Sequence, residues 1–205
     1  MANYYNKVTG VQPQIIPNYP VIKPLRSSIV KYDIIYQGAI NEGRCLKLLV
    51  ETCIANNFSL CICGSGDLNL ELLDWIGKAS NIEWRGEVKP EDLHTYTTQS
   101  AVGFNVLDNS SLSYDESMPN KTFDYIMAGI PQIISSSTQL MKLNNEHQFA
   151  FTLEKLIPSD LATLIKSVKD KNERYLKIKE NCLSLRQKWN WEAMESQLIS
   201  FYKQL

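Results

Sequence analysis

The sequence has no excess of basic residues, few cysteines and no long apolar run, and each absence excludes a class of protein. Its 21 lysine and arginine residues stand against 22 aspartate and glutamate residues in a chain of 205. This balance argues against a nucleic-acid partner, because no positive surface offsets the phosphates. The five cysteines include no C-x-x-C pair, and Cys61 and Cys63 alternate in an apolar run, which indicates small core residues in a reducing cytoplasm. The apolar runs fall far short of the about 20 residues that span a bilayer, and no signal peptide is recognisable, so we expect a soluble protein that is not exported.

Patterns for metal binding or hydrolytic chemistry are also missing. His94 and His147 have no spacing to other ligand residues that matches a metal site. Ser65 lacks the G-x-S-x-G context of a hydrolase nucleophile. We therefore predict no metal site and no serine hydrolase triad.

The sequence does contain a regular alternation of apolar strands and amphipathic helices. Strand-like runs occupy residues 33–37, 58–63, 81–84, 101–106 and 132–134. Helices are expected at 44–57, from Asp67 with Leu70, Leu73 and Ile76, from Pro90, at 120–128, and at 161–168, 175–185 and 191–202. This alternation predicts a single doubly wound, Rossmann-like α/β domain with a parallel sheet of about six strands and C-terminal helices.

Both ends of the chain differ from this alternating body. Residues 1–32 carry four prolines and no sustained periodicity, which indicates an extended junction segment, such as an inter-domain linker trimmed from a longer protein. Residues 33–158 form the expected α/β domain. Residues 159–205 supply the C-terminal helices that complete it.

A glycine-rich turn, Gly64-Ser65-Gly66, lies between an expected strand and the helix that follows it. Such a turn lets a ligand approach the backbone and offers free N–H groups to a phosphate. Asn69 stands where a full dinucleotide motif has its third glycine. A tight turn that requires positive φ is an equally simple interpretation.

Two carboxylates, Glu116 and Asp124, lie eight residues apart, one in a loop and one in the opening turns of a helix. Carboxylates accept strong hydrogen bonds, so this pair is suited to two hydroxyl-rich parts of one ligand. The alternative is two solvated acids, of which Asp124 is also favoured near a helix N-terminus.

An ordered series of short motifs carries a family resemblance. The motifs are Tyr36-Gln-Gly38, Gly43-Arg44, Gly64-Ser-Gly66, Asn81-Ile-Glu-Trp-Arg-Gly86, Pro119-Asn-Lys121, Phe123-Asp-Tyr125 and Ala128-Gly-Ile-Pro131. Together they resemble the C-terminal domain of group 1 glycosyltransferases, family four of the GT-B fold, over nearly the whole chain. Members of that fold have two doubly wound domains facing a cleft, with the acceptor mainly on the first and the nucleotide sugar mainly on the second. The resemblance implies that this chain is the donor-binding half of a GT-B fold.

The resemblance also implies roles for particular residues. Glu116 and Asp124 match the two acids of the E-x7-E signature, with Asp in place of the second Glu, so Glu116 is expected on the donor sugar and Asp124 on the ribose. Gly64, Ser65 and Gly66 match the family's glycine turn, and Arg85, Gly86 and Val88 match the segment beside the nucleobase. Gly38, Pro119 and Asn120 belong to further matched motifs and are expected near the donor.

The phosphate contacts differ from the usual family pattern. Relatives often have Gly-Arg after the first strand and Lys-Gly a few residues on, where this sequence has Gly38-Ala39 and Glu42-Gly43. Arg44 and Lys121 are our substitutes, because Arg forks and Lys point charges offset a diphosphate. With the amides of the glycine turn, they are expected to stabilise charge on the leaving diphosphate while Glu116 orients the sugar. The alternative for both is a solvated surface cation.

The resemblance implies retaining transfer of a sugar from a UDP- or GDP-sugar to an acceptor hydroxyl, without a tightly bound metal. The acceptor, a glycan or lipid-linked saccharide, would bind a separate N-terminal domain, without which this chain is expected to be inactive. The family-level setting is cytoplasmic synthesis of surface polysaccharide or glycolipid, with the parent enzyme peripheral at the inner face of the membrane. Two alternatives stay open: a non-catalytic or split-subunit module that binds nucleotide sugar, and a nucleotide-sugar isomerase on a related scaffold.

Overall fold

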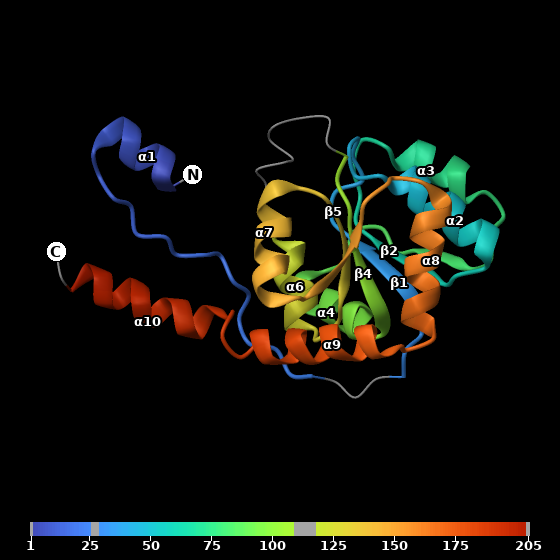
Figure 1. Ribbon diagram of the computed structural model, residues 1–205. Coiled ribbons are helices and arrows are strands. Elements are labelled where there is room, and N and C mark those ends of the chain that lie inside the picture. Colours follow the sequence, from blue (N-terminus) through green and yellow to red (C-terminus); the bar gives the residue numbers. More distant parts are fainter. Residues whose placement is uncertain (1, 26–28, 109–117, 204–205) are drawn as a thin grey trace.

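Six parallel strands form the centre of the computed structural model, which describes residues 2–25, 29–108 and 118–203 (Figure 1). The strands are β1 (Tyr32–Gln37), β2 (Leu60–Cys63), β3 (Ile82–Trp84), β4 (Ser100–Asn105), β5 (Gln132–Ser135) and β6 (Ala150–Leu153). Their order across the sheet is β3-β2-β1-β4-β5-β6. β1 therefore lies inside the sheet, with Ile34 opposite Leu60 of β2 and Val102 of β4.

Helices cover both faces of this sheet. The helices of the described residues are α1 (Ala2–Thr9), α2 (Leu46–Asn56), α3 (Asn69–Ile76), α4 (Pro90–Thr98), α6 (Lys121–Met127), α7 (Thr138–His147), α8 (Pro158–Lys169), α9 (Glu173–Leu185) and α10 (Trp191–Tyr202), of which α1 and α10 project away from the sheet (Figure 1). On one face, α2, α3 and α8 pack against a core that includes Ile34 and Val102. On the other, Leu93 of α4 and Tyr125 of α6 pack around Ile35. Apolar residues on both sides of β1 are typical of a parallel sheet that is buried on both faces.

The predicted fold class is confirmed. The sheet is parallel and doubly wound, and its strand order is that of the Rossmann fold. Two elements, α7 and β6, lie where the sequence analysis assigned nothing. Cys61 and Cys63 are buried as interpreted, with their Sγ atoms 3.7 Å apart. None of the helices in the described ranges is long and apolar enough to cross a membrane.

The first residues form a helix, α1, where the sequence indicated only an extended segment. The helix ends at Gly10, which has φ 71° and donates its N–H to Asn6 O at 2.8 Å. A glycine in this conformation is a common helix terminator, because it carries no Cβ to clash. The eight residues of α1 contain neither proline nor glycine, and the prolines of the segment begin at Pro13.

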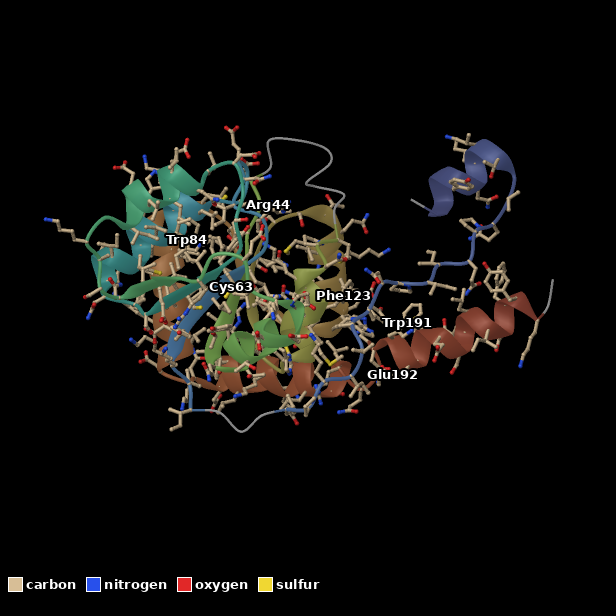
Figure 2. All side chains as sticks on the ribbon, turned by 180° about the vertical axis from the view of Figure 1, so that it is seen from behind. Arg44, Cys63, Trp84, Phe123, Trp191 and Glu192 are labelled. Carbon is tan, nitrogen blue, oxygen red and sulfur yellow. The ribbon has the colours of Figure 1, made fainter. Side chains whose placement is uncertain are left out.

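Contacts with the C-terminal helices hold the later part of this segment on the domain. Trp191 donates its N–H to Pro20 O at 3.0 Å. Arg186, the residue directly after α9, donates to Met127 O at 2.9 Å and also to Lys23 O. Figures 1 and 2 show α1 and α10 projecting from the same side of the domain, away from the sheet.

Candidate functional site

The sheet changes direction of winding between β1 and β4. From β1 the chain continues to β2 on one side, whereas β4 and the strands after it lie on the other. In open α/β sheets, ligands bind outside the carboxyl ends of the strands at this switch point. Here that place is occupied by the turn after β1, which begins with Gly38 and Ala39.

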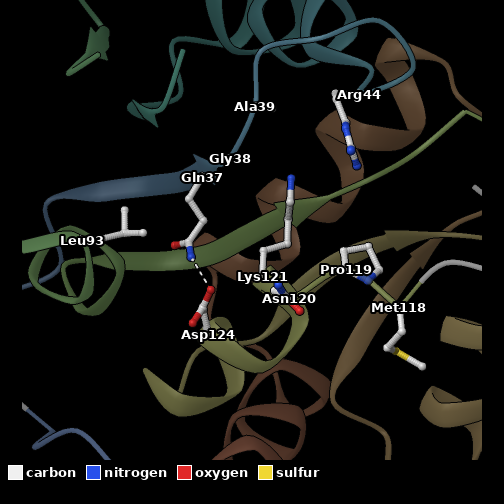
Figure 3. A pocket seen from close by; sticks show the side chains of 10 residues that line it. All are labelled: Gln37, Gly38, Ala39, Arg44, Leu93, Met118, Pro119, Asn120, Lys121 and Asp124. Atoms are coloured by element: carbon white, nitrogen blue, oxygen red, sulfur yellow. Dashed lines mark hydrogen bonds between the residues drawn. The ribbon is translucent and has the colours of Figure 1, made fainter. Parts of the chain in front are cut away.

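Two neighbouring pockets open at this point. The larger, of about 490 Å³, is lined by Gln37, Gly38, Ala39, Arg44, Leu93, Met118, Pro119, Asn120, Lys121 and Asp124 (Figure 3). The smaller, of about 360 Å³, is lined by Gly38, Ala39, Cys63, Gly64, Ser65, Glu87, Val88 and Leu93. Because Gly38, Ala39 and Leu93 line both, the pockets are adjacent, and each volume falls in the range of small-molecule sites. We call them the charged pocket and the glycine pocket.

Lys121, the first residue of α6, reaches into the charged pocket. Its Nζ lies 4.1 Å from the centroid of the Tyr36 ring and beside Gly38, where a Cβ would be 3.4 Å from it. Burial lowers the pKa of the Lys121 ammonium to about 7, and the nearby charge of Arg44 adds to the shift. Among the described residues, no carboxylate forms an ion pair with Lys121.

Arg44 enters the same pocket from the turn that precedes α2 (Figure 3). Its neighbours Gly43 and Cys45 both have left-handed backbone conformations, with φ 79° and 51°. A left-handed non-glycine residue costs free energy and persists only where the surroundings fix it. Here Gly43 O accepts a hydrogen bond from Asp108 N at 2.9 Å, which ties this turn to the chain after β4.

Asp124, one turn after Lys121 on α6, supplies the carboxylate of the charged pocket. Its Oδ2 accepts a hydrogen bond from Gln37 Nε2 at 3.2 Å. Burial raises the pKa of the Asp124 carboxyl, while Lys23 and the Gln37 bond act in the opposite direction. Cations and a half-buried carboxylate therefore share one pocket, which suits a ligand that carries both phosphates and hydroxyls.

The glycine turn is tied to its neighbours through the backbone. Gly64 N donates to Gly86 O at 2.7 Å, and Gly66 N donates to Asn69 Oδ1 at 3.0 Å. Gly64 and Ser65 line the glycine pocket, whereas Gly66 lines neither pocket. The Gly64 and Gly66 amides are therefore both hydrogen-bonded within the protein, and their expected role toward a phosphate stays a prediction.

Close backbone packing is what requires these glycines. A Cβ on Gly64, whose φ is 142°, would lie 1.9 Å from Gly38 O. A Cβ on Gly66 would lie 2.5 Å from Ile40 O. The turns after β1 and β2 are therefore packed directly against each other beside both pockets, and we call this pair of turns the ledge.

The residues expected beside the nucleobase are separated. Val88 lines the glycine pocket, and Gly86 supports it through the bond from Gly64. Arg85 lines neither pocket, because its guanidinium is paired with Glu83 and lies 5.4 Å from the Tyr96 ring. Its side chain thus belongs to a cluster with Glu83 and Tyr96, and the expected contact with the donor stays a prediction.

Of the remaining predicted site residues, two line the charged pocket and one lies outside the described residues. Pro119 and Asn120 line the charged pocket together with Lys121. Glu116 lies outside the described residues. Gln37 and Leu93 also line the pocket and were not predicted from the sequence as site residues. Gln37 had a usable signal, because it is a polar residue directly after the apolar run Ile34-Ile35-Tyr36 at the end of a buried strand.

Comparison with known families decides the wider assignment. A sequence profile described as glycosyl transferase-like matches residues 41–199, which is most of the chain. The chain belongs to the glycosyl transferase-like family. No curated protein matches its sequence.

Solved structures agree with this glycosyl transferase-like domain in fold. HepE from Anabaena, solved with UDP, superposes with a TM-score of 0.67 at 10% identity over 85% of this chain. Sucrose-phosphate synthase from Thermosynechococcus elongatus gives 0.71 at 18% over 98%, and the pneumococcal O-GlcNAc transferase GtfA, solved with UDP and GlcNAc, gives 0.71 at 15% over 98%.

The chain covers 49%, 55% and 42% of these three proteins, about half of their length. With the family match, this confirms the predicted resemblance to one domain of a group 1 glycosyltransferase, half of a GT-B fold.

Proposed function

We propose that this chain is the donor-binding domain of a retaining glycosyltransferase that moves a sugar from a nucleoside diphosphate sugar to an acceptor hydroxyl. One observation carries the proposal: Arg44 and Lys121 reach from different elements into one pocket at the switch point of the sheet, and Asp124 lies in the same pocket. Family membership supports the same reaction class.

The two cations are suited to a diphosphate. Arg44 offers a planar fork of donors and Lys121 a point charge, and phosphate oxygens accept both. In the proposed reaction the bond between the anomeric carbon and the β-phosphate oxygen breaks, so negative charge grows on the diphosphate. Fixed positive groups at that place lower the barrier more than mobile water would.

Asp124 is proposed to accept hydrogen bonds from the ribose hydroxyls. Its side chain is one methylene shorter than the glutamate of the family signature, so its position depends closely on the backbone of α6. Glu116 is proposed to orient the donor sugar. Residues Pro119 and Asn120 shape the wall between these groups.

The glycine pocket is proposed to hold the nucleobase. Val88 and Leu93 give it an apolar wall, and the Ser65 hydroxyl, which donates to Glu87 at 2.7 Å, gives it a polar edge. HepE was solved with UDP and UDP-glucose, and GtfA with UDP, which supports a uridine or other nucleoside diphosphate here. We propose a UDP- or GDP-sugar as donor, without a tightly bound metal.

The rest of the reaction is assigned to a second domain. Transfer needs donor and acceptor held in reacting geometry, so we propose that a separate N-terminal domain binds the acceptor glycan or lipid-linked saccharide. Surface polysaccharide or glycolipid synthesis at the cytoplasmic face of the membrane is the proposed setting. This chain covers about half of the length of the solved structures that it matches, which supports a parent enzyme with two domains.

A second candidate is a non-catalytic or split-subunit module that binds a nucleotide sugar. Ala39 and Glu42 stand where relatives often have cations, which favours weakened chemistry. A GtfA/B complex is among the matching structures, with a TM-score of 0.72 over 99% of this chain. Both candidates share donor binding and differ in turnover.

Calorimetric titration of the 205-residue chain with UDP, GDP, ADP and dTDP, and with their sugars, tests the proposal. One nucleotide should bind selectively, and Arg44→Gln, Lys121→Gln and Asp124→Asn should each weaken it about 10- to 100-fold, the loss typical of a hydrogen bond to a charged group. Lys78→Gln, an exposed lysine outside both pockets, is the matched control and should leave affinity unchanged.

Saturating ligand at about 100 times its Kd should also raise Tm by several degrees. Absence of binding by every nucleotide at millimolar concentration would overturn the proposal for this chain.

A further inference from the structure

A buried polar side chain, that of Gln37, lies between Asp124 and α4. It is the last residue of β1 and is only 2% exposed, in a strand whose other inward residues are apolar. Burying a carboxamide is unfavourable unless its oxygen and nitrogen are both hydrogen-bonded. The hydrogen-bond partners of the Gln37 carboxamide therefore indicate which side chain it positions.

Gln37 is bonded at both ends. Thr97 Oγ1 lies 2.9 Å from Gln37 Oε1 and 2.8 Å from Leu93 O, so the hydroxyl hydrogen is shared between two acceptors. Gln37 Nε2 donates to Asp124 Oδ2 at 3.2 Å (Figure 3). An ionised carboxylate only accepts hydrogen bonds, so it fixes which end of the carboxamide faces it.

This arrangement restricts Asp124. With Oδ2 held by Gln37, Oδ1 is the carboxylate oxygen without a hydrogen bond among the described residues. Asp124 lines the charged pocket, and it also lines a small cavity with Lys23, Gln37, His94 and Thr97. The bond from Gln37 restricts the rotation of the Asp124 carboxylate.

The charges around Asp124 come from several elements. Lys23 of the N-terminal segment and His94 of α4 line the small cavity with it, and Lys121 and Arg44 line the charged pocket. Burial raises the pKa of the Asp124 carboxyl, whereas Lys23 and the N–H donated by Gln37 lower it. Gln37 thus acts on both the direction and the ionisation of this carboxylate.

We propose that Gln37 is a positioning residue for the donor: through its bond to Oδ2 it aims Oδ1 of Asp124 at a ribose hydroxyl, and Thr97 of α4 supports it from behind. This inference rests on the proposed function, because it assigns Asp124 to the nucleotide. It differs from a packing role for Gln37, since its effect on the ligand passes entirely through Asp124.

The test compares Gln37→Met, Asp124→Asn and the double variant by calorimetric titration with UDP and GDP. Methionine matches the length of glutamine and cannot donate. We expect Gln37→Met to weaken nucleotide binding about 10-fold or more. The double variant should be no weaker than Asp124→Asn alone, because residues that act through one another are non-additive.

The matched control is Gln132→Met, another fully buried strand glutamine, whose hydrogen-bond partners line neither pocket. It should lower stability while leaving the affinity of the folded protein unchanged. Full affinity in Gln37→Met, or losses that add in the double variant, would overturn the inference. If Gln37→Met does not fold, Gln37→Glu replaces it: two facing carboxylates should weaken binding at pH 7.5 and, relative to the wild type, recover at pH 5.5.

A second readout separates this inference from the proposed function. If the wild type binds neither UDP nor GDP, the proposed function is wrong, but the Asp124 carboxyl can still be titrated by carbon-13 NMR. Gln37→Met removes the N–H group that donates a hydrogen bond to Asp124 Oδ2, so the pKa of Asp124 should then rise above its wild-type value. An unchanged pKa would show that the contact has no effect on the carboxylate, and the inference would fail on its own.

Discussion

Lys121 combines a buried ammonium with a pKa of about 7, so its charge changes within the physiological range. A lysine is charged below its pKa, and a diphosphate binds the charged form more tightly. Affinity for a nucleotide sugar should therefore fall as the pH rises through 7, by about tenfold between pH 6 and pH 8, because the competent fraction falls. UDP-glucose or GDP-mannose is the suitable probe, since esterified phosphates keep a constant charge over this range.

The control for this prediction is Lys121→Arg. A guanidinium stays charged throughout, so the variant should bind with little dependence on pH between 6 and 8. Calorimetric titration at four pH values measures both proteins. A wild-type affinity that is flat over this range would contradict the assigned role of Lys121.

The candidate site residues could be predicted from the sequence only in part. Arg44, Lys121 and Asp124 were predicted together, and they line one pocket. Gly66 and Arg85 were predicted with them, but backbone packing uses the first and a cluster with Glu83 uses the second. A sequence motif records that a residue type is needed, and only the packing shows whether a ligand or the protein needs it.

At the scale of elements, the ledge formed by the turns after β1 and β2 positions both pockets. Gly64→Ala should destabilise the protein by at least about 3 kcal/mol, because it adds left-handed strain to a collision with Gly38 O at 1.9 Å. Gly86→Ala is the matched comparison, since φ is 63° there and no atom lies within 4 Å of the added Cβ. Its cost should be about 1–2 kcal/mol, the strain alone.

Urea unfolding of the two variants measures this difference. Similar losses in both would mean that conformation, and not the approach of the two turns, requires the glycine. Nucleotide affinity is the second readout, because Gly64→Ala should also shift Gly38 and so weaken binding, whereas Gly86→Ala should do so less.

Elements were predicted well where one periodic pattern dominated. α2 (Leu46–Asn56) lies within the helix expected at 44–57, and its apolar residues Leu46, Leu49, Val50 and Cys53 are buried. α3 forms where a helix was expected, but Leu70 and Leu73 are exposed and Leu72 is buried, because apolar residues occupy more than one face of that short helix. The bond from Leu68 N to Ile40 O sets its start, and this tertiary contact leaves no trace in the sequence.

For the whole molecule, Arg186 joins three segments that are distant in sequence. It lies on the end of α9, is only 6% exposed, and donates to Met127 O after α6 and to Lys23 O of the N-terminal segment. Arg186→Met should cost about 2–4 kcal/mol, because two carbonyls lose charge-assisted bonds. Arg174→Met, an exposed arginine on the same helix, should cost less than about 1 kcal/mol. Thermal and urea unfolding distinguish the two, and equal losses would show that the bonds of Arg186 to the two carbonyls add nothing to stability.

In the proposed scheme, catalysis requires a second domain in addition to this one. The 205 residues span about half of the solved structures they match, and both proposed pockets serve the donor. Because transfer requires two substrates held in reacting geometry, the chain should bind its nucleotide sugar without transferring or hydrolysing it. Phosphorus NMR of chain and donor over one day should show an intact nucleotide sugar, with nucleotide binding in a parallel titration as the positive control. Accumulation of free nucleoside diphosphate that Lys121→Gln abolishes would show that this domain carries chemistry alone, and the assignment of the second domain would then be wrong.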